Sequence, residues 1–134
     1  MEIRIFTEKE QNKQFYGEMG RFFADKKFFK LFGEPLYNGP KSVWFIAYDG
    51  PMISGFCASY EKNTHIYLNN FYVLEEYRGT RVGSALFKKR LDYFAKEDKQ
   101  IRGMVKEERS LHLYLKNGFE VYGHRGYYNL VRKG

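Results

Sequence analysis

The sequence has 134 residues, of which 43% are hydrophobic and 29% are charged. This composition supplies enough apolar surface for one folded core and excludes a disordered chain, so we expect residues 1–134 to form a single domain. The net charge of +7 indicates an anionic partner, and residues 61–134, with fifteen Lys/Arg against nine Asp/Glu, carry +6 of it.

The N-terminal part of the chain predicts a strand followed by one or two helices. Residues 2–6 alternate polar and apolar side chains, as in a half-buried strand. Thr7 then offers an N-cap, with Glu10 at capping-box spacing, for helical residues 8–32. The helical pattern ends at a loop with four breaking residues, Gly33, Pro35, Gly39 and Pro40.

Three antiparallel strands are predicted next. Residues 43–48 and 52–60 flank the turn signal Asp49-Gly50-Pro51 and should form a hairpin, with Trp44 in the core. Residues 64–74, rich in β-branched and aromatic side chains, follow as the third strand.

The pattern changes to helical at Val82, after a turn that contains two glycines. A strand over residues 101–105, a helix over 108–117 that ends at Gly118, and two final strands complete the chain. The predicted order is β-α-α-β-β-β-α-β-α-β-β. We therefore expect an α/β fold whose sheet is mixed, mostly antiparallel and flanked by helices.

Two absences narrow the class of protein. No apolar run reaches the roughly 18 residues needed to cross a bilayer, and the first residues lack the pattern of a signal peptide. Cys57 is the only cysteine, which excludes an internal disulfide and a cysteine-based zinc site, and we expect it to be a packed small residue. We expect a cytoplasmic protein that binds neither a metal nor a membrane.

The most informative stretch joins the third strand of the hairpin region to the following helix. A strand ends near Val73, and a helix opens just after the turn at Arg78-Gly79-Thr80-Arg81. Such a turn points backbone N–H groups and the positive helix end at one place, where a phosphate or pyrophosphate can bind. Gly79 and Gly83 allow close approach, and the two arginines add positive charge. A plain turn with surface arginines is the alternative, and neither a dinucleotide nor a P-loop fingerprint is present.

At these residues the chain resembles the GCN5-related N-acetyltransferase (GNAT) superfamily. The positions that match its acetyl-CoA signature are Val73, Tyr77, Arg78, Gly79, Gly83 and Leu86. A second match lies at Leu113-Tyr114-Leu115-Lys116-Asn117-Gly118-Phe119, in the same order as in that superfamily. Glu75 and Arg81 depart from the pattern, because they stand where a proline and a glycine are frequent. Arg81 fits if the backbone there is already helical.

The resemblance implies the fold, the cosubstrate and the roles of several residues. Acetyl-CoA would be the acetyl donor, with its pantetheine arm along the backbone near Phe71 and Val73. Its pyrophosphate would lie beside Arg78 and the amides of the turn, which are those of Gly79, Thr80, Arg81, Val82, Gly83 and Ser84. Tyr114 would protonate the departing thiolate. From the residues alone, Tyr114 could equally be a core residue, because it shares a helix face with Leu111 and Leu115.

No general base stands out in the sequence. Alternation along the strand places Tyr67, Asn69 and Phe71 on the same face as Val73, and none of them is a carboxylate. His65 could start a water relay or be an ordinary polar residue.

The resemblance therefore predicts an N-acetyltransferase that acts on a primary amine of a small molecule or a protein, as a monomer or homodimer. A non-catalytic CoA-binding module and a basic nucleic-acid-binding domain are the alternatives, and the second explains the charge but not the two motifs. We expect helical residues 15–32, the loop at 33–42 and the last strands near Tyr122, Tyr127 and Tyr128 to line the acceptor pocket.

Overall fold

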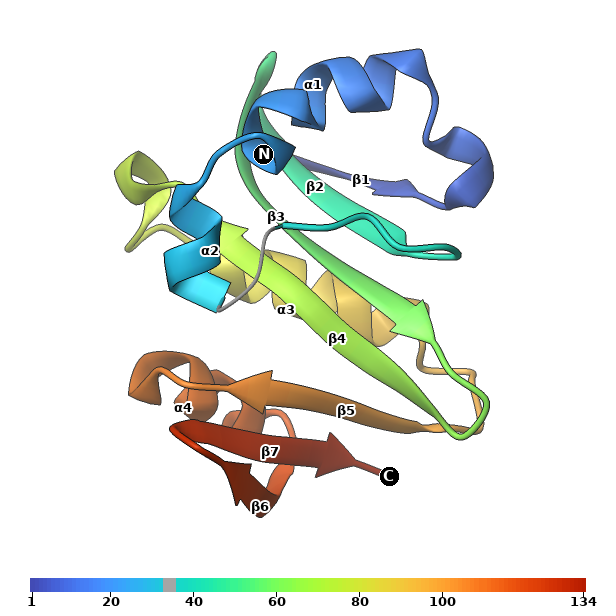
Figure 1. Cartoon of the computed structure of the whole chain (residues 1–134), viewed down its shortest axis with the longest axis vertical. Coiled ribbons are helices and arrows are strands. Elements are labelled where there is room, and N and C mark those ends of the chain that lie inside the picture. Colours follow the sequence, from blue (N-terminus) through green and yellow to red (C-terminus); the bar gives the residue numbers. More distant parts are fainter. Residues whose placement is uncertain (33–35) are drawn as a thin grey trace.

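One seven-stranded sheet runs through the described part of the computed structural model, which covers residues 1–32 and 36–134 (Figure 1). The strand order is β1-β2-β3-β4-β5-β7-β6, and every neighbouring pair is antiparallel except β4 and β5, which are parallel. The strands are β1 (Glu2–Phe6), β2 (Val43–Asp49), β3 (Met52–Glu61), β4 (His65–Val73), β5 (Gln100–Val105), β6 (Glu120–Arg125) and β7 (Tyr128–Lys133). The expected mixed, mostly antiparallel sheet is confirmed.

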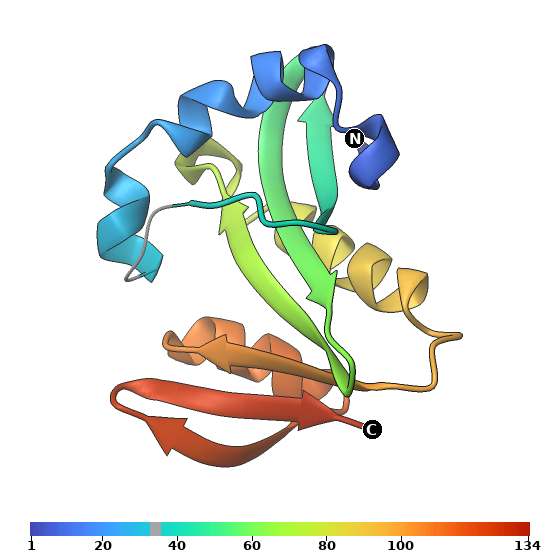
Figure 2. The same cartoon turned by 45° about the vertical axis from the view of Figure 1, so that its right-hand side comes forward.

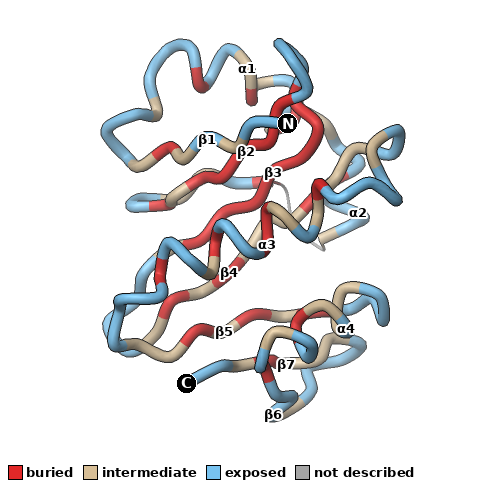
Figure 3. Tube along the Cα trace, turned by 180° about the vertical axis from the view of Figure 1, so that it is seen from behind, coloured by how far each residue is buried: buried red, intermediate tan, exposed pale blue. Residues whose placement is uncertain are grey.

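Helices cover both faces of this sheet. Their bounds are α1 (Lys13–Phe23), α2 (Lys27–Phe32), α3 (Val82–Tyr93) and α4 (Glu108–Lys116). In Figure 1 helices α1 and α2 lie in front of the sheet, and in Figure 3, which shows the molecule from behind, α3 and α4 lie in front. The core accordingly divides into an aromatic cluster under α1 and α2, which includes Trp44, and a second cluster under α3 and α4. None of the described helices is long and apolar enough to cross a membrane.

The first helix begins later than the sequence pattern predicts. Thr7 and Glu10 do form a capping box, but it closes a short 3-10 turn over Glu8–Glu10. The cap of α1 is Asn12, whose side chain accepts a hydrogen bond from the Phe15 N–H. Between the two, Gln11 leaves the helical region, and its side chain donates to the carbonyls of Phe6 and Ser42. Of the predicted breakers, Gly33 and Pro35 lie outside the described residues.

A β-bulge in β4 changes which side chains share a face of the sheet. Ala58 pairs with Asn69, and Phe56 pairs with Tyr72, so β4 advances three residues where β3 advances two. The extra residue falls at Asn70, whose φ is 55°. After the bulge, Phe71 packs in the cluster under α3 and α4, and Tyr72 packs in the other cluster.

The prediction that Tyr67 and Asn69 share a face with Val73 is therefore wrong. Val73 packs in the same cluster as Ile66 and Leu68, which alternate with Tyr67 and Asn69 along β4. The physical reason is the inserted residue, since one extra residue moves all later side chains of a strand to the opposite face.

Strands β4 and β5 are paired over only part of their length. Their register runs from His65 with Gln100 to Leu68 with Gly103. Beyond that pair β4 continues to Val73 while β5 turns away, and Figure 2 shows the two ribbons diverging. We call this divergence the split; its closed end is the Leu68–Gly103 pair.

Candidate functional site

The turn before α3 has the geometry of an anion site. Helix α3 begins at Val82, and its first backbone bond is donated by the Ala85 N–H to the Arg81 carbonyl at 3.0 Å. The amides of Val82, Gly83 and Ser84 belong to the first turn of the helix, where N–H groups have no intrahelical acceptor. The amides of Arg78 and Thr80 are already engaged, since they donate to Glu75 and Tyr77 within the preceding turn. The amides at the start of α3 are thus available to an anion, whereas that of Thr80 is used within the turn.

The two glycines of this turn differ in whether the fold requires a glycine at their position. Gly79 has a φ of +81°, a backbone conformation that residues with a Cβ rarely adopt. A Cβ at Gly83 would meet only Val73 and Phe71 side-chain atoms, at 3.5 to 3.9 Å, which is ordinary contact. The fold therefore does not require glycine at position 83. Because Gly83 has no side chain, the start of α3 is open beside the end of β4, and a ligand could approach it there.

The arginines of the turn also differ. Arg81 occupies the N-cap of α3 with φ −90° and ψ 13°, so its backbone is acceptable for a residue with a side chain. Arg78 folds back along β4: its Nε donates to the Val73 carbonyl at 3.1 Å, and its guanidinium lies 5.5 Å from the Tyr72 ring centroid. Both arginines are exposed, but Arg78 has a structural contact, whereas Arg81 lies at the start of α3.

Tyr114 reaches the closed end of the split from α4. Its side chain is 7% exposed and packs edge-on against Phe87 and Phe119, at ring-centroid distances of 4.8 and 5.0 Å. A Cβ at Gly103 would lie 3.4 Å from the Tyr114 hydroxyl, which is ordinary contact distance and places the phenol directly against this position of β5. The core interpretation and the site interpretation of Tyr114 do not exclude one another, because its ring is packed while its hydroxyl lies beside the last β4–β5 pair.

Arg90 of α3 is a residue that the sequence reasoning missed. It is 0% exposed, and its Nη1 donates to the carbonyls of Ala58 at 3.0 Å and Asn69 at 3.3 Å. Its Nη2 donates to the Tyr114 hydroxyl at 3.4 Å. Spacing was the available signal, since Arg90 follows Leu86 by four residues and Phe87 by three and so lies on the apolar face of α3.

The electrostatics of the site follow from burial and from this one cation. Burial raises the pKa of the Tyr114 phenol, and the Arg90 charge works in the opposite direction. Burial also raises the pKa of the Cys57 thiol, to about 11, so Cys57 is a neutral packed residue at ordinary pH. The expectation of a packed Cys57 is confirmed.

The predicted cofactor residues come together at one end of β4. The Phe71 ring lies 6.4 Å from that of Phe87, which in turn contacts Tyr114. Val73 lies beside Gly83 at the start of α3. His65, by contrast, lies at the opposite end of β4, where it pairs with Gln100, and its Nδ1 shares a hydrogen bond with the Thr64 hydroxyl.

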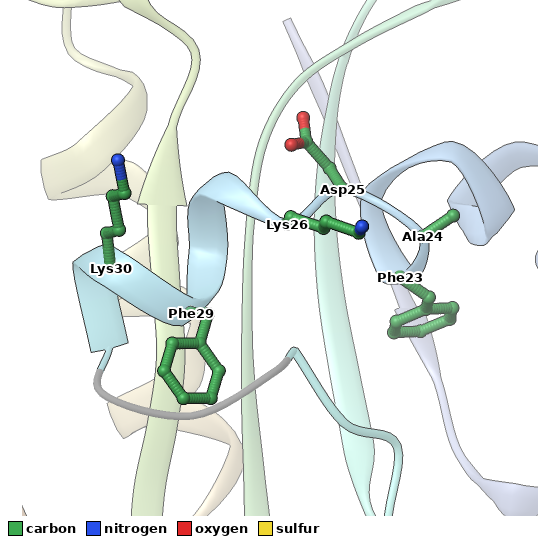
Figure 4. A pocket seen from close by; sticks show the side chains of 6 residues that line it. All are labelled: Phe23, Ala24, Asp25, Lys26, Phe29 and Lys30. Carbon is green, nitrogen blue, oxygen red and sulfur yellow. The ribbon is translucent and has the colours of Figure 1, made fainter.

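The acceptor side is less well defined. A surface hollow at the junction of α1 and α2 is lined by Phe23, Ala24, Asp25, Lys26, Phe29 and Lys30 (Figure 4). A second hollow adjoins the end of β4 and contains side chains of both charges. It is lined by Arg21, Phe22, Asp25, Lys27, Tyr72, Leu74, Glu75 and Glu76.

Near the split, the Asn70 side chain donates to the Tyr37 carbonyl, and the Tyr128 hydroxyl donates to the Phe32 carbonyl. These two bonds tie the segments predicted to line the acceptor pocket to β4 and β7; residues 33–35 of that lining lie outside the described part.

Comparison with known proteins points to one family. A model of the acetyltransferase (GNAT) domain matches residues 40–121. The fold is similar to that of ElaA from Escherichia coli, with a TM-score of 0.75 and 15% identity over 99% of both chains. An acyl-CoA N-acyltransferase from Pseudomonas aeruginosa gives 0.77 and 10% over 99% of both chains. A GNAT family acetyltransferase from Elizabethkingia anophelis, solved with acetyl-CoA bound, gives 0.67 and 14% over 98% of this chain and 97% of that one. A search of curated protein sequences found no match.

Proposed function

The chain belongs to the GNAT acetyltransferase family, and on that basis we propose that it transfers the acetyl group of acetyl-CoA to a primary amine by direct attack. One observation carries the proposal. The open first turn of α3 lies against the diverging part of β4, and the Tyr114 hydroxyl lies where β4 and β5 part, one suited to the pyrophosphate and the other to the thioester.

Acetyl-CoA would be held by backbone groups first and by charge second. The amides of Val82, Gly83 and Ser84 would bind the pyrophosphate, with Arg81 adding positive charge from the exposed side. The pantetheine arm would follow β4 past Val73 and Phe71, in the manner of an added strand in the split. Arg78 would keep its bond to the Val73 carbonyl and would brace the end of the strand rather than serve mainly as a phosphate ligand.

The transfer uses one proton donor of this chain. A neutral amine attacks the thioester carbonyl carbon, the new C–N bond forms, and the C–S bond breaks. The Tyr114 phenol gives its proton to the departing sulfur, the amine nitrogen loses its extra proton to solvent, and the phenolate regains a proton from water. The products are the N-acetylated amine and CoA with a free thiol.

Net charge bears on the class of acceptor. The charge of +7 on the whole chain disfavours acceptors with several positive charges. Amino acids, simple alkyl amines and protein amino groups fit better.

A transfer assay tests the proposal directly. Acetyl-CoA is incubated with the protein and a panel of primary amines, and the released CoA is measured with a thiol-reactive chromogen. The only cysteine, Cys57, is buried, so the native protein adds little thiol signal. Thiol release that depends on both protein and amine supports the transferase. Tight CoA binding with no transfer to any amine would instead favour the non-catalytic CoA-binding module.

A further inference from the structure

A fully buried cation sits between β4 and the candidate acid. The Arg90 guanidinium donates to the carbonyls of Ala58 and Asn69 and to the Tyr114 hydroxyl, and it lies 5.3 Å from the Phe71 ring centroid and 5.8 Å from that of Phe87. Its partners are therefore neutral carbonyls, one phenol and two ring faces.

No acidic side chain balances this charge within the described residues. The ion pairs found there join other residues, and Arg90 takes part in none of them. Its Nε is buried without a hydrogen-bond partner. Burying a cation without a counter-ion is costly, and a well-packed apolar side chain at such a position is often neutral or stabilising. The hydrogen bonds to the carbonyls of Ala58 and Asn69 hold Arg90 in the fold, but they leave its charge unbalanced and its Nε unsatisfied.

We propose that Arg90 is a positioning residue for acyl transfer, which holds the Tyr114 hydroxyl at the closed end of the split and stabilises the negative charge that develops on the phenol and the departing sulfur. The inference rests on the proposed function, in which Tyr114 is the acid. The counter-ion that the resting fold lacks would then be present only in the transition state, which is where such a charge accelerates a reaction.

The direction of the hydrogen bond supports this role. A guanidinium can only donate, so the Tyr114 oxygen must be the acceptor in its bond with Arg90. The phenol proton is then left for a different acceptor, and the described residues show no hydrogen bond donated by that hydroxyl. Arg90 thus orients the phenol with its proton available to the sulfur.

The same guanidinium also links the acid to the bulge of β4. Its bond to the Asn69 carbonyl is made immediately before Asn70, the residue that carries the positive φ. One planar group therefore ties β3, β4 and the Tyr114 hydroxyl of α4 together, close to where β4 diverges from β5. A lysine, with one nitrogen, cannot bridge the same three acceptors in a plane.

Few other ionisable groups act on the phenol. Around it, α3 supplies Arg90 and β3 supplies Cys57, while β5 presents Gly103. Burial raises the pKa of Tyr114 most strongly, the charge of Arg90 lowers it, Cys57 raises it, and the hydrogen bond from Arg90 lowers it by the smallest amount. Removal of the arginine should raise the pKa of Tyr114 further and make the phenol a weaker acid.

The test replaces Arg90 by an unbranched apolar residue, Arg90→Met, beside Lys88→Met, which removes one positive charge from the exposed face of the same helix. The pKa of Tyr114 is followed by NMR of tyrosine labelled with ¹³C at Cζ, with the resonance assigned from Tyr114→Phe. We expect a higher Tyr114 pKa in Arg90→Met and the wild-type value in Lys88→Met. An unchanged Tyr114 pKa in Arg90→Met would overturn the inference without reference to any acceptor.

Kinetics with an amine found in the transfer assay supply the second measurement. We expect kcat of Arg90→Met to fall by about tenfold or more with KM for acetyl-CoA within about twofold, and Arg90→Lys to recover part of the loss. In a Tyr114→Phe background the same substitution should cost little. An equal loss in both backgrounds would show that Arg90 acts only on the fold. If Arg90→Met does not fold, Arg90→Lys carries both measurements.

A wild-type protein that transfers to no amine refutes the proposed function, and with it the catalytic part of this inference, whatever the NMR titration shows.

Discussion

Tyr114 combines a packed ring with a hydroxyl that we propose to be the acid of the transfer. Because its ring contacts Phe87 and Phe119, Tyr114→Phe should leave the packing intact and cost only about 1 kcal/mol of unfolding free energy, from the lost bond with Arg90. CoA affinity should stay close to wild type. The transfer rate should fall by roughly 10²-fold, the effect expected of a positioned acid. Steady-state kinetics, CoA titration and denaturation measure the three quantities.

Tyr93→Phe is the matched control, since Tyr93 is 42% exposed at the last residue of α3, away from the turn, and its hydroxyl should affect neither rate nor stability. A Tyr114→Phe rate within a few-fold of wild type would refute the assignment as acid. The transferase would survive that result, because CoA thiolate leaves readily and orientation alone contributes to the rate.

A substitution at Gly83 tests CoA binding separately from the stability of the fold. Gly83→Val should weaken CoA binding at least about tenfold, because a branched side chain would stand where a phosphate approaches the first turn of α3. The fold should tolerate the new Cβ, whose neighbours lie at ordinary contact distance. Gly17→Val is the control, since Gly17 is also helical with open space around it but lies on α1. Calorimetry with CoA and thermal melts of both variants separate the two effects; equal CoA affinity in the two variants would contradict the assignment of the turn.

Cys57 makes stability depend on pH. Burial raises its pKa in the folded protein to about 11 from an ordinary value of 9.0. The contribution of the neutral thiol is fully present below pH 9.0 and is lost as the pH rises toward about 11, since the unfolded state gives up its proton first. The loss should reach about 2–3 kcal/mol. Denaturation of the wild type and of Cys57→Ala between pH 8 and 11 measures it: the difference in unfolding free energy should shrink over this range, and a constant difference would refute the shift.

At the level of elements, the bulge in β4 is the feature on which the site depends. It moves Phe71 and Val73 to the α3 side of the sheet, next to Gly83 and Arg90. It requires Asn70 to adopt a φ of 55°, which asparagine tolerates better than most residues. Asn70 therefore adopts a backbone conformation of higher free energy, and this conformation places the diverging half of β4 against both the α3 turn and the cluster around Tyr114.

Substitution at the bulge should expose that cost. Asn70→Val should destabilise the protein by about 1–2 kcal/mol, because a β-branched residue fits the left-handed region poorly. Asn70→Gly should cost less, since it loses the bond to the Tyr37 carbonyl but keeps the backbone freedom. Asn129→Val, in the regular part of β7, is the control. Urea denaturation ranks the variants, and equal stability of Asn70→Val and Asn129→Val would show that the bulge is not strained.

For the whole molecule, ligand binding should stabilise the native state. CoA that binds only the folded protein adds RT ln(1 + [L]/Kd), about 2.7 kcal/mol at a hundredfold excess over Kd. The melting temperature should therefore rise with CoA concentration. Gly83→Val at the same concentrations is the internal control, with a smaller rise. No shift and no calorimetric heat at millimolar CoA would argue against both the transferase and the CoA-binding module.

The sequence by itself determined the order of the elements and the place of the α3 turn. Both depend on short-range physics: alternation in strands, 3.6-residue periodicity in helices, and glycines where the chain must turn. The family resemblance added Tyr114 and the expected acetyl-CoA residues, whose roles stay predictions.

Only the tertiary structure decided which residues meet. The bulge at Asn70 arises from pairing with β3, so alternation along β4 alone put Tyr67 and Asn69 on the wrong face. Asn12 rather than Thr7 caps α1 because Gln11 is held by carbonyls of Phe6 and Ser42, the second of them 31 residues away. Arg90 lies in the core because carbonyls of two strands and the Tyr114 hydroxyl receive its hydrogen bonds. These are contacts between distant parts of the chain, and local sequence patterns do not encode them.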